Sequence, residues 1–156
     1  MTSAGAGLVI DASLAMAWYF ADEGTAATEA LLDRVTRGGA VVPSHWKLEV
    51  ANALQTAVRR GRVTTAFRDA SLADLAELAI AVESDTATYA WTTTVRLADR
   101  FRLTIYDAAY LELANRRGLP LATLDGELRT AAAALDVPLL GLDPNLSSLA
   151  VPAPRP

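Results

Sequence analysis

Residues Leu8-Val9-Ile10-Asp11-Ala12-Ser13 contain the pattern that decides the fold, because three apolar residues run directly into an aspartate. Two of the three are β-branched, which is typical of a short buried strand. In an open parallel sheet, ligands bind beyond the carboxyl ends of the strands, so this pattern predicts that Asp11 lies at the mouth of a crevice. The alternative is that Asp11 or Ser13 only caps the following helix.

The composition limits the classes of protein that fit. The chain has 156 residues, which indicates one domain with its own core. It has no cysteine and one histidine, His45, which excludes disulfides, thiolate metal sites and multi-histidine zinc sites. The net charge of −4 argues mildly against a nucleic-acid binder, although bound cations reverse the sign of an acidic cluster. We expect no membrane-spanning segment and no signal peptide, and therefore a cytoplasmic protein.

Short apolar runs alternate with helical patterns along the chain. We expect strands at residues 7–11, 40–43, 79–82, 119–124 and 137–140. We expect helices at residues 13–20, 25–37, 45–60, 64–78, 86–100, 107–117 and 127–135. This alternation predicts an α/β fold, a three-layer α/β/α sandwich around a central, mainly parallel sheet. The domain is expected to cover residues 1–143, followed by a proline-rich tail at 144–156.

Four acidic residues occur at expected strand ends and helix starts. Asp11 and Asp125 end strands, Asp107 starts a helix, and Glu49 lies one turn into the helix after the second strand. These positions share one edge of a parallel sandwich, so the four carboxylates are expected to converge. The ordinary alternatives are helix caps for Asp107 and Asp125 and a solvated face for Glu49. Asn52 lies on the same helix face as Glu49, and we expect that face near the core, where a carboxylate needs a partner.

Converging carboxylates point to hard-cation chemistry. Like charges repel unless something positive joins them, and oxygen ligands suit Mg²⁺ or Mn²⁺. Mg²⁺ held by few carboxylates keeps several waters and binds phosphate oxygens, an arrangement that hydrolyses phosphodiesters. Ser13 and Thr123 have two interpretations. They hydrogen-bond to these carboxylates or to the substrate backbone, or they make local capping and turn bonds, which the sequence favours slightly.

Four segments together resemble the PIN-domain family, and more narrowly its VapC-type toxin ribonucleases. The segments are LVIDAS at 8–13, residues 43–54 with Glu49, YDAAYLELA at 106–114 and LATLD at 121–125. The resemblance implies a Mg²⁺- or Mn²⁺-dependent endoribonuclease that acts on structured RNA such as tRNA or rRNA. It also implies a homodimer that a VapB-like antitoxin inhibits.

The resemblance also implies roles for individual residues. It assigns catalysis and metal binding to the acidic quartet, which is Asp11, Glu49, Asp107 and Asp125. Asp11 and Asp107 are implied as the main metal ligands. Ser13, Asn52 and Thr123 are implied to support the quartet.

Other side chains have two interpretations. Since no nucleophile motif accompanies it, His45 is expected at the surface or as a cap rather than as a general base. We expect the three tryptophans in the core or an interface rather than stacked on RNA bases; they are Trp18, Trp46 and Trp91. Apolar residues of the helices at 25–37 and 64–78 form either core or a groove for an antitoxin helix.

The arginines are open to two interpretations as well. Arg116 and Arg117 are expected to be solvated cations at a helix end. Arg59, Arg60 and Arg62 fit either that description or contacts with an RNA backbone, and the sequence favours neither.

Two other functions compete with a nuclease. One is a module that binds RNA or a partner with little catalysis. The other is an aspartyl-phosphate phosphatase with Asp11 as the nucleophile, which would need a lysine near the site. Lys47 is the only lysine in the chain.

Overall fold

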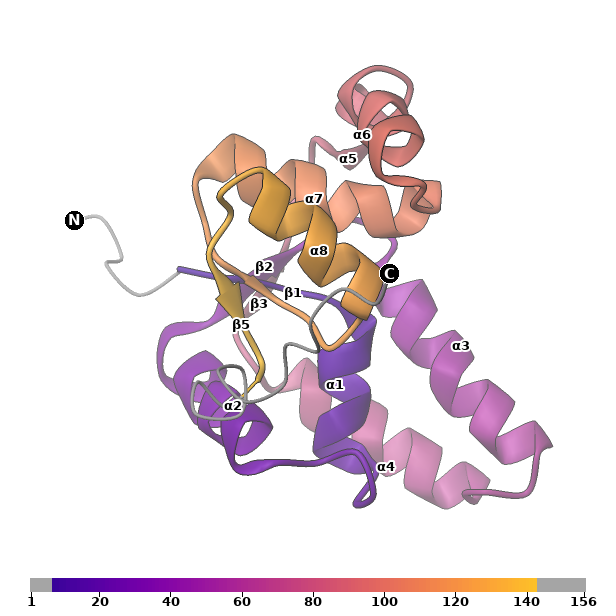
Figure 1. Ribbon diagram of the computed structural model, residues 1–156. Coiled ribbons are helices and arrows are strands. Elements are labelled where there is room, and N and C mark those ends of the chain that lie inside the picture. The colour runs from indigo at the N-terminus through magenta and orange to yellow at the C-terminus, as the bar shows by residue number, and fades with distance from the viewer. Residues whose placement is uncertain (1–6, 143–156) are drawn as a thin grey trace, which may run out of the picture.

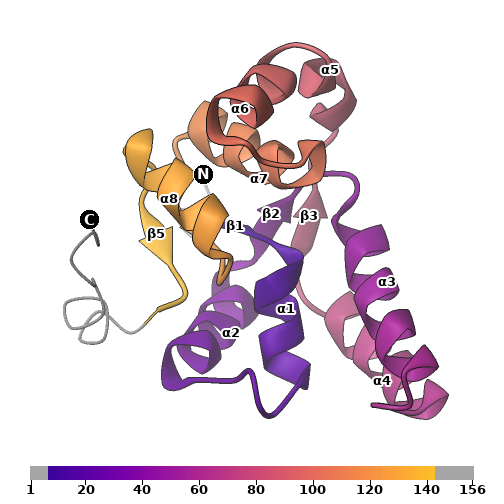
Figure 2. The ribbon, with the colours of Figure 1, turned by 45° about the vertical axis from the view of Figure 1, so that its right-hand side comes forward.

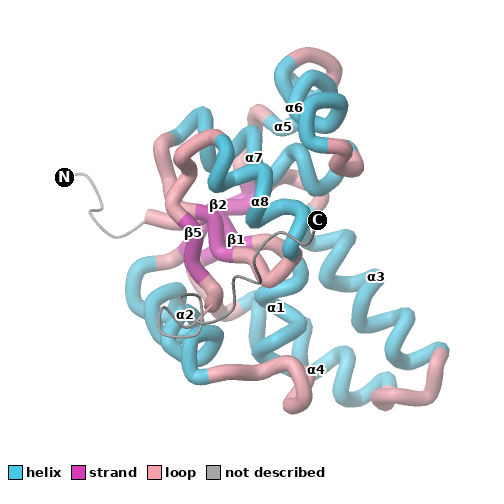
Figure 3. The backbone as a smooth tube through the Cα atoms, viewed as in Figure 1, coloured by secondary structure: helices cyan, strands magenta, loops and turns pink. Residues whose placement is uncertain are grey.

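Five short parallel strands form one sheet at the centre of the computed structural model, which describes residues 7–142. In the order β3-β2-β1-β4-β5 they are Ile80–Val82, Ala40–Val42, Val9–Ile10, Leu121–Ala122 and Leu139–Leu140. Val9 pairs with both Val41 and Leu121, so β1 is the central strand. The α/β prediction is confirmed, since helices surround this sheet (Figure 3).

Eight helices connect the strands within the described residues. They are α1 (Ala12–Tyr19), α2 (Ala26–Gly38), α3 (Trp46–Arg59), α4 (Thr65–Ala76), α5 (Thr86–Ala90), α6 (Thr93–Phe101), α7 (Ile105–Arg117) and α8 (Gly126–Ala134). Helices α7 and α8 lie on one face of the sheet, and α1 and α2 lie on the other (Figure 1). Helices α3 and α4 run side by side away from the sheet, and α5 and α6 lie outside α7 (Figure 2).

The core sits on both faces of the central strand. Leu8, Val9 and Ile10 are fully buried, as are Tyr110 and Leu111 of α7. Burying each aliphatic side chain of this size contributes about 1.5–3 kcal/mol. The packing of β1 therefore fixes the point where the strand ends and Asp11 begins.

The expected helices agree with the observed ones to within one or two residues at their ends except at 86–100, and the differences there and at the start of α7 have a physical reason. The helix expected at 86–100 is two helices, α5 and α6, and the break falls at Trp91 and Thr92. The β-branched run Thr92–Thr94 lowers helix propensity there. Helix α7 begins at Ile105 instead of Asp107 because the Thr104 side chain caps it, accepting a hydrogen bond of 3.1 Å from the Asp107 N–H.

The expectations for residues 1–6 and for the tail at 144–156 lie outside the described residues. Within residues 7–142, we find no helix with the length and apolar character needed to cross a membrane.

Candidate active site

Asp11 lies where β1 ends and α1 begins, and it is 4% exposed. Its carboxylate accepts hydrogen bonds from the hydroxyls of Ser13, at 2.7 Å, and Thr123, and from the Leu14 N–H at 3.1 Å. The last of these makes Asp11 the N-cap of α1. The capping interpretation of the opening motif is confirmed, and the capping carboxylate directly follows the central strand, as expected.

The environment of Asp11 makes its ionised form costly. Burial raises the pKa of Asp11 to about 6, although the hydrogen bonds from Thr123, Ser13 and Leu14 act in the opposite direction. The charge of Asp107 raises the pKa further. A buried, hydrogen-bonded carboxylate whose pKa is nevertheless raised is suited to accept a cation.

Ser13 and Thr123 join the ends of β1 and β4. Besides donating to Asp11, the Ser13 hydroxyl accepts from the Leu124 N–H at 3.1 Å. The Thr123 hydroxyl accepts from the Asp125 N–H at 3.0 Å. The structure thus brings Ser13, Thr123 and Asp11 into one network, which is one of the two arrangements that the sequence leaves open.

Glu49 has two partners that the sequence analysis missed. The Tyr110 hydroxyl donates to Oε1 of Glu49 at 2.8 Å, and Nε2 of His45 lies 3.0 Å from the same oxygen. Nε2 also lies 3.0 Å from the carbonyl oxygen of Tyr106. Because both neighbours of Nε2 are oxygen acceptors, this geometry requires the proton on Nε2. His45 occupies the N-cap position of α3, as expected, but its side chain makes no capping bond and instead contacts Glu49.

Asp107 and Asp125 face the same region. Burial raises the pKa of Asp107, and the charges of Asp125 and Glu49 raise it further. Asp125 also caps α8, accepting from the N–H groups of Glu127 at 2.9 Å and Leu128 at 3.2 Å. The charge of Asp107 thus reaches Asp11, and the charges of Asp125 and Glu49 reach Asp107, so the four carboxylates lie near one another at the carboxyl edge of the sheet.

The donor set fits a hydrated cation. Within residues 7–142, no three acidic or histidine side chains already surround a common point where a metal ion would be held. Mg²⁺ usually needs only one or two carboxylates, with water as the remaining ligands. A cation near Asp11 and Asp107 would relieve the repulsion that raises both of their pKa values.

Asn52 is not part of this group. Its side chain is exposed on α3, and no hydrogen bond joins it to the quartet in the described part of the chain. The expectation that its face lies near the core is wrong, because α3 turns Val50, Leu54 and Ala57 inward instead.

The family of the chain follows from a sequence match that spans this whole arrangement. A model of the PIN domain matches residues 8–134, from β1 to the end of α8. This chain belongs to the PIN-domain family. The resemblance to VapC-type ribonucleases is confirmed as well, since this PIN-domain chain is 35% identical to Ribonuclease VapC3 of Mycobacterium tuberculosis. That match covers 102 residues, which are 65% of this chain and 72% of the relative.

Two solved structures share the PIN-domain fold. PAE2754 from Pyrobaculum aerophilum has a TM-score of 0.62 and 24% identity, covering 83% of this chain and 87% of its own. Mycobacterium tuberculosis VapC20, described as a sarcin-ricin loop cleaving toxin, has a TM-score of 0.56 and 20% identity. That match covers 80% of this chain and 94% of VapC20.

Two spacings in the sequence are compatible with the contacts of Glu49 but do not predict them. His45 and Glu49 are four residues apart on one helix face, and Tyr110 follows Asp107 by three on another. Neither spacing shows that the two helices meet at Glu49.

Proposed function

We propose that this PIN-domain protein is a divalent-metal-dependent endoribonuclease that uses Mg²⁺ or Mn²⁺. The observation that carries the proposal is the buried Asp11 carboxylate, with a pKa of about 6, facing the charge of Asp107. The 35% identity to Ribonuclease VapC3 supports RNA as the substrate.

The proposed reaction adds water across a phosphodiester bond. The bound cation supplies Lewis acidity and lowers the pKa of a water molecule. Asp11 and Asp107 would hold the cation, while the hydroxyls of Ser13 and Thr123 fix the orientation of Asp11. Water attacks phosphorus as the bond to the 3′ oxygen breaks, which leaves a 5′-phosphate and a 3′-hydroxyl.

Glu49 and Asp125 complete the proposed site. Glu49 has one carboxylate oxygen committed to Tyr110 and His45, so its other oxygen can orient a water. Asp125 uses Oδ1 to cap α8, which leaves its second oxygen for the same purpose.

The resemblance to VapC supports a biological setting that we also propose. The protein would be the toxin of a toxin–antitoxin pair and would act on tRNA or rRNA. It would form a homodimer and be inhibited by a VapB-like antitoxin. A cytoplasmic location follows from such a substrate.

The proposal is tested with purified protein and total cellular RNA in Mg²⁺, Mn²⁺ or EDTA. We expect discrete fragments that require metal and are lost in Asp11→Asn and Asp107→Asn. Asp99→Asn is the matched control, since Asp99 is an exposed acid on α6, and it should cleave like the wild type. No cleavage by folded protein free of inhibitor would favour the binding-module alternative.

The phosphatase alternative needs a lysine near Asp11, and within residues 7–142 the structure does not pair Lys47 with the quartet. Lys47 is exposed on α3 and lines a pocket of about 180 Å³ with Leu75 and Ile80. It makes no ion pair with the quartet within the described residues. A covalent phosphoenzyme formed during phosphate-ester turnover would instead support the phosphatase function.

A further inference from the structure

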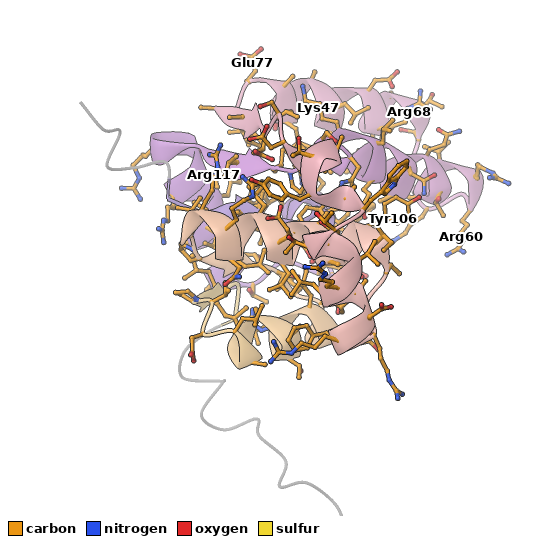
Figure 4. All side chains as sticks on the ribbon, turned by 90° about the horizontal axis from the view of Figure 1, so that it is seen from above. Lys47, Arg60, Arg68, Glu77, Tyr106 and Arg117 are labelled. Atoms are coloured by element: carbon orange, nitrogen blue, oxygen red, sulfur yellow. The ribbon has the colours of Figure 1, made fainter. Side chains whose placement is uncertain are left out.

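A pocket of about 230 Å³ is lined in part by His45, the residue that contacts Glu49 of the quartet. Its walls come from the start of α3 and from α5, α6 and α7. The lining residues are Ser44, His45, Thr86, Ala87, Ala90, Thr94, Ile105, Tyr106 and Ala109. We call this the Tyr106 pocket, after the exposed side chain labelled in Figure 4.

The Tyr106 pocket is tied directly to the site. Nε2 of His45 lies 3.0 Å from both the Tyr106 carbonyl oxygen and Oε1 of Glu49. Tyr106 immediately precedes Asp107 in α7. A group bound in the pocket would therefore lie next to His45, which contacts Glu49 of the quartet.

The residues that line the pocket favour an uncharged ligand. The described residues that line the pocket include no lysine, arginine, aspartate or glutamate, so the pocket does not suit a phosphate. Thr94 is 2% exposed and is one of the residues that line the pocket. The Thr86 hydroxyl accepts from the Ser44 N–H at 2.9 Å and keeps its hydrogen to donate.

The size of the pocket and its walls suit one flat ring. The volume is below the 300 Å³ or more that is usual for drug-sized ligands. Ala87, Ala90 and Ala109 leave much of the wall free of large side chains. The Tyr106 ring is 63% exposed and lies 5.6 Å from the His45 ring between centroids, at an angle of 53°.

We propose that the Tyr106 pocket binds one unstacked RNA base next to the scissile phosphate, with the Tyr106 ring as the stacking surface. The inference rests on the proposed endoribonuclease function. Proteins that read single-stranded RNA commonly stack bases on aromatic side chains and hydrogen-bond their edges. The hydroxyls of Thr86 and Thr94 supply such edge contacts, so this pocket contributes to the choice of cleavage site.

The first test measures binding without cleavage. Fluorescein-labelled dodecamers A₁₂, C₁₂ and U₁₂ are compared with an abasic ribose-phosphate dodecamer of equal charge, in EDTA, by fluorescence anisotropy. We expect wild type to bind at least one base-bearing RNA about tenfold more tightly than the abasic strand. Tyr106→Ala should lose this preference, whereas Tyr106→Phe, which keeps the ring, should retain it.

Two further variants sharpen the binding test. Ala90→Leu fills the pocket and should reproduce the loss seen with Tyr106→Ala. Leu48→Ala removes a side chain that is 74% exposed on α3 and does not line the pocket, so it should behave like wild type. Equal preference for bases in wild type and Tyr106→Ala would overturn the proposal. So would a change of oligomeric mass in Tyr106→Ala with base preference intact, because a second copy of the chain would then occupy the pocket.

The second test uses cleavage, so that the two proposals fail separately. If total RNA is cut, a synthetic RNA spanning the mapped site is made with one abasic nucleotide beside the cut. Abasic substitution should lower kcat/KM in wild type but have little further effect in Tyr106→Ala. If the abasic substitution and Tyr106→Ala lower kcat/KM independently, so that their effects multiply, the base-pocket proposal is overturned while the nuclease proposal stands. If nothing is cut, the nuclease proposal fails while the anisotropy result still decides whether the pocket binds a base.

Discussion

The Tyr110 hydroxyl donates a 2.8 Å hydrogen bond to Oε1 of Glu49, across 61 residues of sequence and between two helices. Tyr110 is fully buried, and its burial together with the charge of Glu49 raises the pKa of the phenol, so it stays protonated and can only donate to the carboxylate. Glu49 is therefore held in one orientation by a group that cannot ionise near neutral pH.

Tyr110→Phe should lower RNA cleavage by about tenfold, because residues that orient metal-site groups typically matter by 10–100-fold. The free energy of unfolding should fall by only about 1 kcal/mol, since one hydrogen bond is lost while His45 still holds Glu49. Tyr19→Phe is the matched control, because that hydroxyl reaches Asp74 at the surface. Equal activity in both variants would contradict the role of Tyr110.

Asp11→Asn should stabilise the metal-free protein near pH 7.5 while it abolishes activity. The pKa of Asp11 rises from 3.8 to about 6 on folding, so its contribution to stability is present below pH 3.8 and is lost as the pH rises through 6. Removing the charge should therefore raise the free energy of unfolding at pH 7.5 by at most about 3 kcal/mol. Urea denaturation at pH 7.5 and pH 4 measures this: the gain should appear at pH 7.5 and vanish at pH 4. A destabilised variant at pH 7.5 would contradict it.

Protons should compete with the cation at the same site. Since the pKa values of Asp11 and Asp107 are both raised, lowering the pH from 7.5 to 5.5 should weaken apparent Mn²⁺ affinity. Protonation of Asp11 alone predicts a loss of about fourfold over this range. Calorimetric titration with Mn²⁺ at the two pH values measures the change. An affinity independent of pH would show that Asp11 is not a ligand.

The strand ends could be predicted from sequence because they depend on local pattern. The run before Asp11 is apolar and β-branched, and a parallel sheet brings its carboxyl edge together with that of the strand before Asp125. The exposed position of Asn52 could not be predicted, because the rotation of α3 about its axis depends on which of its residues the rest of the fold buries. Val50 and Leu54 are buried, and this turns Asn52 to solvent.

The ion pairs of Arg116 are a second feature that the sequence does not predict. At the end of a helix it was expected to be solvated, but its guanidinium lies 3.1 Å from Glu83 and 2.7 Å from Glu112. Both carboxylates are almost fully buried, at 3% and 4% exposure. The pairing with Glu83 depends on how β3 meets α7, which no local spacing reports.

Removing Arg116 should destabilise the fold strongly. Arg116→Ala leaves two buried carboxylates without their main cation, which typically costs about 3–5 kcal/mol. Arg117→Ala should cost less than about 1 kcal/mol, because Arg117 is half-exposed and lies 4.0 Å from Glu83. Urea denaturation of both variants measures the difference. A similar small loss for both would mean that solvent already screens the cluster.

The three arginines at the end of α3 have different environments. Nη2 of Arg62 lies 2.6 and 2.8 Å from the two carboxylate oxygens of Asp22, and the guanidinium sits 4.2 Å from the Phe20 ring centroid. Arg59 and Arg60 are exposed, and Figure 4 labels Arg60 at the outer end of α3. The sequence left all three open to RNA binding, but only Arg59 and Arg60 extend to solvent without an acidic partner among the described residues.

Arg59→Ala/Arg60→Ala should therefore weaken RNA binding and make it less sensitive to salt. Ten residues of helix place these cations about 15 Å from Glu49, within reach of a backbone that crosses the quartet. Two lost phosphate contacts on a single strand should reduce the slope of log affinity against log salt by about 1.4. Arg62→Ala is the control, which should lower stability through Asp22 and Phe20 while keeping the slope. Anisotropy with U₁₂ from 50 to 300 mM salt measures both, and an unchanged slope in the double variant would assign these arginines to solvent alone.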